Sequence, residues 1–174
     1  MSEITFISNK TRKQTFKYFF VIVFAVISWI LQVSVFNRFL YFDTAPNLLL
    51  LGCIYWGLIL GPTFGAVFGI VSSFFCASIL YDHIFYFSYP IIGILSGFLI
   101  KNIFSDELLF FILLSFLFTI PLEILNGWQY NLANPINIFD RYLMIGFNSA
   151  VLNLFLSPFF YWIMKFITKK SALG

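Results

Sequence analysis

Few side chains in this sequence could carry out chemistry. Of the 174 residues, seven are Asp or Glu and one is His. Glu123, in the stretch TIPLEILNG, is the only carboxylate inside a predicted apolar segment apart from Glu107, which begins the same segment. An ionisable residue at membrane depth is a candidate for ion or proton handling. Because the predicted segment ends at Leu125, just after Glu123, we favour a carboxylate that reaches the lipid headgroups over a buried functional group.

The remaining reactive residues do not form a recognisable site. His83 lies beside Asp82, but a zinc site requires three or four protein ligands, and no others occur at metal-site spacing. Cys53 and Cys76 lie in apolar segments without a CxxC pattern and are interpreted as small buried hydrophobic residues. No nucleophile elbow, phosphate-binding loop or pair of carboxylates occurs. We therefore predict a protein that is not an enzyme and has neither a metal nor another cofactor.

The composition indicates an integral membrane protein. Hydrophobic residues make up 61% of the chain and charged residues 10%, whereas soluble domains contain about 25% charged residues. The mean hydropathy is +0.95. The basic residues lie at the ends of apolar segments, where they orient a protein in the membrane, so the net charge of +3 is not taken as evidence for nucleic-acid binding.

The apolar segments predict an all-α fold with six transmembrane helices. Residues 46–80 carry no charge, and one helix of that length would measure about 52 Å, far more than the ~30 Å hydrocarbon core. We place a turn at Gly61-Pro62, because Gly readily ends a helix and Pro suits a first turn. Asp43 or Thr44 is expected to cap the helix before this turn, with Pro46 in its first turn. The predicted spans are residues 17–36, 46–60, 62–80, 88–103, 107–125 and 142–167.

The distribution of basic residues predicts the orientation. With six crossings and a cytoplasmic N-terminus, eight of the ten Lys and Arg residues lie inside, and only Arg38 and Arg141 lie outside. We therefore predict a cytoplasmic N-terminal tail at 1–16, a transmembrane domain at 17–168, and a cytoplasmic C-terminal tail at 169–174.

Small residues recur at every fourth position in three of these spans. They are Gly57, Gly61, Gly65, Gly69 and Ser73, followed by Gly93 and Gly97. Such rows allow another helix backbone to approach closely. We favour packing within the monomer, and a partner's helix docked on the row is the alternative. In the last span, Asn153 shares one helical face with small residues and is expected to hydrogen-bond to a neighbouring helix.

Three stretches carry a resemblance to a known family: PNLLLLGCIYWGLILGPTFGAVFGIV, PIIGILSGFLIKNIF and NSAVLNLFLSPFFYWIMKFITKK. Over about residues 30–168 the chain resembles MreD, the rod shape-determining membrane proteins. The resemblance implies six helices arranged like the S component of ECF vitamin transporters, in the bacterial cytoplasmic (inner) membrane. It also implies a scaffold of the cell-elongation complex that binds an MreC-like bitopic protein and links MreB filaments to peptidoglycan synthesis. Asp82 comes later than the acidic residue of many such proteins, and no glycine follows it, so no role is carried onto Asp82.

The S component of an ECF-type vitamin transporter is the alternative function. Such a component is expected to show an alanine-xxx-alanine docking row, but the first span offers only Ala25 and then Trp29. This favours the scaffold. The longest predicted outer connector, NGWQYNLANPINIFDR, carries Trp128, Ile138 and Phe139, which could contact a partner or the membrane surface.

Overall fold

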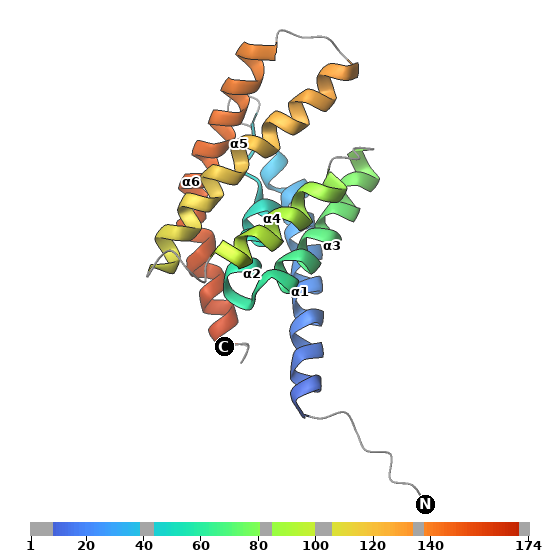
Figure 1. Ribbon diagram of the computed structural model, residues 1–174, viewed down its shortest axis with the longest axis vertical. Helices are drawn as coiled ribbons and strands as arrows, with labels where there is room; N and C mark the ends of the chain where they lie inside the picture. The colour runs from blue at the N-terminus through green and yellow to red at the C-terminus, as the bar shows by residue number, and fades with distance from the viewer. Residues whose placement is uncertain (1–8, 39–43, 81–84, 100–105, 134–137, 171–174) are drawn as a thin grey trace, which may run out of the picture.

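The described part of the chain is almost entirely helical (Figure 1). The computed structural model describes residues 9–38, 44–80, 85–99, 106–133 and 138–170. These residues form six α-helices, with a short 3-10 turn, η1, at Phe36–Arg38 after the first. The helices are α1 Asn9–Ser34, α2 Leu48–Leu60, α3 Pro62–Leu80, α4 Phe85–Leu99, α5 Glu107–Ala133 and α6 Ile138–Lys170. The all-α class predicted from the sequence is confirmed.

The turn between α2 and α3 falls where the sequence predicts it, but the start of α2 does not. Gly61 separates the two helices at φ 105°, and its N–H donates to the Gly57 carbonyl at 3.1 Å. The residue that caps α2 is Asn47, whose side chain accepts from the Leu50 N–H at 2.9 Å. The prediction of an Asp43 or Thr44 cap with Pro46 in the first turn is therefore wrong. Asn47 directly precedes the helix, and its short side chain reaches the free N–H groups of the first turn.

Helices α1, α5 and α6 extend well beyond their predicted ends. Helix α1 begins at Asn9, so residues 9–16 of the predicted N-terminal tail are helical. Helix α5 continues to Ala133 and α6 begins at Ile138, so most of the predicted 126–141 connector is helix as well. The pair Asn126-Gly127 does not end α5, which continues to Ala133.

Helix α2 lies at the centre of the molecule. Every residue from Leu48 to Leu58 is buried, and α1, α3, α4, α5 and α6 all pack against this helix. Figure 1 shows α5 and α6 running side by side on one flank, with α1, α3 and α4 on the other. Aromatic rings fill the core near the C-terminal half of α2, where Tyr55 makes edge contacts with Trp56, Phe111 and Phe160.

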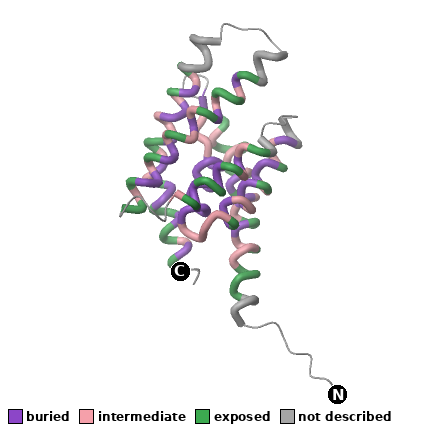
Figure 2. The backbone as a smooth tube through the Cα atoms, in the orientation of Figure 1, coloured by how far each residue is buried: buried purple, intermediate pink, exposed green. Residues whose placement is uncertain are grey.

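The molecule is apolar outside and partly polar inside. Large apolar side chains are exposed along the five helices that surround α2, as at Phe98 (64%), Phe155 (67%) and Trp162 (68%). Figure 2 shows such exposed positions recurring along α1, α5 and α6. Hydroxyl and amide side chains lie in the interior, including fully buried Thr119 and Asn153. An apolar surface of this extent does not suit a soluble monomer but suits a lipid environment.

Within the described residues, three helices are long and apolar enough to cross a membrane. Their apolar stretches are Lys13–Arg38, Glu107–Trp128 and Met144–Lys169, of 26, 22 and 26 residues. The apolar stretches of α2, α3 and α4 are shorter than the ~20 residues of a typical crossing.

Candidate functional site

The glycine row is occupied by another helix of the same chain. A Cβ atom built on Gly65 would lie 2.7 Å from the Gly57 Cα and even closer to the Gly93 carbonyl. One built on Gly69 would lie 2.6 Å from the Pro90 nitrogen in α4. These distances leave no room for a side chain, so α2, α3 and α4 meet backbone to backbone. The space beside these glycines therefore cannot hold a partner's helix.

The other small residues of the row have different surroundings. Gly57 faces α4, because a Cβ atom there would lie 3.2 Å from the Gly97 nitrogen and would meet the Ser96 hydroxyl. Gly97 in turn faces Pro62 at the start of α3. Ser73 is buried further along α3. Gly61 has nothing within 4 Å of a built Cβ atom, so its role is the positive φ of the turn.

Asn153 joins three helices through hydrogen bonds. Its Oδ1 accepts from the Asn47 backbone N–H at 2.7 Å, and its Nδ2 donates to Thr119 Oγ1 at 2.9 Å. The side chain is fully buried on α6. It therefore ties α6 to α5 and to the start of α2, and it satisfies one of the unpaired N–H groups at a helix N-terminus.

Polar side chains from other helices also contact the start of α2. Gln32 of α1 accepts from the Leu48 N–H at 2.8 Å and donates to the Pro46 carbonyl at 3.0 Å. Asn47 donates from Nδ2 to the hydroxyl of Tyr89 in α4 at 2.9 Å. This network was not predicted from the sequence. An Asn directly before a long apolar run is the signal that could have identified the cap.

A cavity of about 270 Å³ lies beside this network. Glu123 lines it, and α5 continues past this residue to Ala133, so the prediction that Glu123 sits at the end of its helix is wrong. The side chains of Asn126 and Ser149 lie within hydrogen-bonding reach of the Glu123 carboxyl group. The residues that line the cavity are Trp29, Gln32, Val33, Asn37, Ala45, Asn47, Leu49, Cys76, Tyr89, Glu123 and Asn126.

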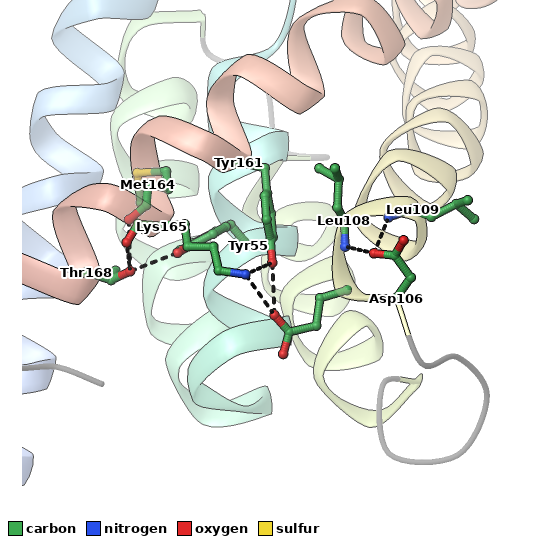
Figure 3. A network of polar contacts seen from close by, with 9 residues as sticks. Tyr55, Asp106, Leu108, Leu109, Tyr161, Met164, Lys165 and Thr168 are labelled. Carbon is green, nitrogen blue, oxygen red and sulfur yellow. Dashed lines mark hydrogen bonds and ion pairs between the residues drawn. The ribbon is translucent and has the colours of Figure 1, made fainter.

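A second polar cluster lies toward the other end of α6 (Figure 3). Tyr161 donates to Glu107 Oε2 at 2.9 Å, and Lys165 Nζ lies 3.3 Å from the Tyr161 hydroxyl and 3.8 Å from the same carboxylate oxygen. The hydroxyl groups of Tyr55 and Thr168 are 3.0 Å apart. These contacts connect α2, α5 and α6.

The remaining candidate residues are not gathered at either cluster. Trp128 is 61% exposed on α5, away from the core. Ile138 and Phe139 belong to the first turn of α6, but their side chains lie outside the described part, as do Asp82 and His83. Among the described residues, no group of three or more His, Cys, Asp or Glu could hold a metal ion.

Comparisons with protein-family models, with curated proteins and with solved structures returned no match. The chemistry of the site therefore rests on its own geometry. The cavity combines a carboxyl group, amides and an indole ring, which suit binding through hydrogen bonds and charge.

Proposed function

We propose that the chain is a non-enzymatic membrane scaffold of the MreD type. It crosses the bacterial cytoplasmic (inner) membrane six times with both termini in the cytoplasm. It binds an MreC-like bitopic protein and thereby links MreB filaments to cell-wall synthases. The observation that carries the proposal is the apolar surface on the five helices around buried α2, because such a body offers lateral contacts to other helices in the bilayer.

Six crossings are compatible with the shortness of α2. Its 13 residues span about 20 Å, less than the hydrocarbon core. Irregular backbone at membrane depth is tolerated where protein surrounds it and satisfies its polar groups. Gln32 and Asn153 supply such partners just before and at the start of α2. An even number of crossings also agrees with Figure 1, in which α1 begins and α6 ends at the same end of the molecule.

The contact with an MreC-like partner is proposed at the junction of α5 and α6. Trp128 is exposed there, and these two helices project beyond the others in Figure 1. Replacing Trp128, Ile138 and Phe139 together with Ser tests the contact. Co-purification with the partner is expected to fall about tenfold or more, because exposed aromatic residues often carry much of an interface's binding energy.

The matched control replaces Trp162 and Phe166, which are exposed on α6 far from that junction, with Ser. This variant is expected to retain the partner. If the triple variant accumulates normally and still co-purifies with the partner, these three residues anchor the protein in the membrane and do not form the contact.

The cellular role is tested by depletion in a rod-shaped host. Loss of an MreD-type scaffold is expected to give rounded cells, which can be measured by microscopy. Normal cell shape after depletion, together with no MreC-like protein in the purified material, would refute the scaffold role.

The S component of a vitamin transporter is the second candidate, and the cavity is the observation that favours it. Its volume of about 270 Å³ lies just below the ~300–1,000 Å³ of typical ligand pockets. Ala25 of α1 is fully buried, so it offers no surface for docking another subunit. Native mass spectrometry of the purified protein separates the candidates, because only the S component is expected to carry a vitamin-sized ligand.

A further inference from the structure

The cavity lies between two helices that do not pack on each other. Trp29 and Val33 of α1 line one side, and Glu123 and Asn126 of α5 line the other. Among the described residues, α1 packs on α2, α3 and η1 but not on α5. Val33 and Asn37 at its edge are exposed. The cavity therefore opens toward the surroundings of the protein.

The two sides differ in their remaining hydrogen-bonding capacity. On the α1 and α2 side, the amides of Gln32 and Asn47 are used by backbone groups and by Tyr89. On the α5 side, Asn126 Oδ1 is buried without a hydrogen-bond partner. The Glu123 carboxylate can accept about four hydrogen bonds, and among the described residues the side chains of Asn126 and Ser149 lie within reach of it. The α5 side of the lining therefore holds buried acceptors with unused capacity.

Within the part of the chain that the structure describes, the charge of Glu123 also lacks a counterpart. No Lys or Arg of the described residues forms an ion pair with it, whereas Glu107 has Lys165 nearby. A buried carboxylate is costly unless a cation or several donors compensate it. The indole of Trp29, held in place by stacking on Phe75 at 4.9 Å between ring centroids, adds an aromatic surface that attracts cations.

We propose that this cavity binds a primary ammonium group. Such a group has three N–H donors and one positive charge, which match the free Asn126 Oδ1 and the Glu123 carboxylate. The group can come from the headgroup of phosphatidylethanolamine or from a free small amine. The exposed edge of the cavity at Val33 and Asn37 suits the lipid, whose acyl chains would stay in the bilayer. This site goes beyond the scaffold function, and failure of partner binding would leave it standing.

The test uses the full-length protein purified in detergent without added lipid. Thermal unfolding is followed while ethylammonium chloride, tetramethylammonium chloride, dioctanoyl phosphatidylethanolamine or dioctanoyl phosphatidylglycerol is titrated. Native mass spectrometry counts the bound lipids. Ethylammonium or the ethanolamine lipid is expected to raise the midpoint temperature of unfolding, and the increase should saturate as the ligand concentration rises. Tetramethylammonium, which has no N–H donor, and the glycerol lipid are expected to bind at least tenfold more weakly.

Two variants locate the site. Glu123→Gln keeps the shape and removes the charge, and it is expected to weaken binding about tenfold or more. Glu107→Gln, which alters the other carboxylate of α5, is expected to leave binding unchanged. If Glu123→Gln does not fold, the proposal is still tested by the wild-type protein, through its preference for ethylammonium over tetramethylammonium and for the ethanolamine lipid over the glycerol lipid.

Each outcome has a defined meaning. Stabilisation by the ethanolamine lipid alone supports a lipid source, and stabilisation by ethylammonium alone supports a free amine. Equal effects of ethylammonium and tetramethylammonium, equal binding of the two lipids, unchanged binding by Glu123→Gln, or no binding of either amine overturns the proposal.

Discussion

Helices α2, α3 and α4 are joined in a different way from α5 and α6. In the first group, glycines bring backbones together, so that Gly65 lies directly against Gly93. In the second group, side chains lie between the helices. Phe111 packs on Phe160 with ring centroids 6.3 Å apart, and Asn153 bonds to Thr119.

The comparison shows two solutions to one physical problem. Helices in lipid gain little from the hydrophobic effect when they associate, so they need close van der Waals contact or hydrogen bonds. Backbone contact leaves no space for an added atom. A joint made of side chains has several separate contacts, and each one contributes a smaller amount. A single substitution in the backbone contact of α2, α3 and α4 should therefore cause a large loss of stability. A single substitution between α5 and α6 should cause a smaller loss.

The largest expected effect comes from Gly65→Ala. The new methyl group would overlap the Gly93 carbonyl and the Gly57 backbone, so α3 and α4 must move apart. We expect a loss of about 1–3 kcal/mol or more in the free energy of unfolding, measured by SDS titration in mixed micelles.

Gly146→Ala in α6 is the matched control. A Cβ atom there would lie 3.5 Å from the Glu123 Cβ, an ordinary contact. Because Ala favours helix over Gly by about 1 kcal/mol, this variant is expected to be neutral or more stable. Equal losses in the two variants would refute the contrast between the joints.

Gly61→Ala is expected to have the next largest effect, for a different reason. A methyl group would meet no atom within 4 Å. However, Gly61 has a φ of 105° and a ψ of 173°, a backbone conformation that residues other than glycine rarely adopt. We expect a loss of about 1–3 kcal/mol in the same titration. A variant as stable as the wild type would mean that the turn between α2 and α3 relaxes easily.

Asn153→Ala tests the side-chain joint. It removes bonds to the Asn47 N–H and to Thr119, and it leaves the start of α2 short of an acceptor. Hydrogen bonds between membrane helices contribute about 0.6 kcal/mol on average and rarely more than 1.7 kcal/mol. We expect a loss of about 1 kcal/mol, below that of Gly65→Ala. A larger loss than for Gly65→Ala would reverse the proposed order.

The sequence predicted features that depend on local conformation and missed those that depend on which helices are neighbours. The Gly61-Pro62 turn follows from backbone preferences alone. The interior position of Asn153 follows from the spacing of small residues in its span. The cavity unites Trp29 of α1 with Glu123 of α5, and nothing in the periodicity of either segment indicates that they lie close together. The end of α5 was also misplaced, because Asn126-Gly127 permits a helix end without requiring one.

The smallest effect is expected at the second polar cluster, for Lys165→Met. The substitution removes the ion pair with Glu107 and the bond to Tyr161, while the Tyr161–Glu107 bond at 2.9 Å remains. The side chains of Lys165 and Glu107 are 59% and 54% exposed, so solvent screens their attraction. Exposed ion pairs contribute about 0–1 kcal/mol, and we expect a loss below about 0.5 kcal/mol in the SDS titration.

Tyr161→Phe sharpens this last prediction. It removes the hydroxyl group that both Glu107 and Lys165 contact, and the Tyr161 side chain is largely buried against Phe111. The loss in the free energy of unfolding caused by Tyr161→Phe should therefore exceed that caused by Lys165→Met. If Lys165→Met is the more damaging of the two, the ion pair is less screened than its exposure indicates, and the α5–α6 joint depends on charge more than on buried hydrogen bonds.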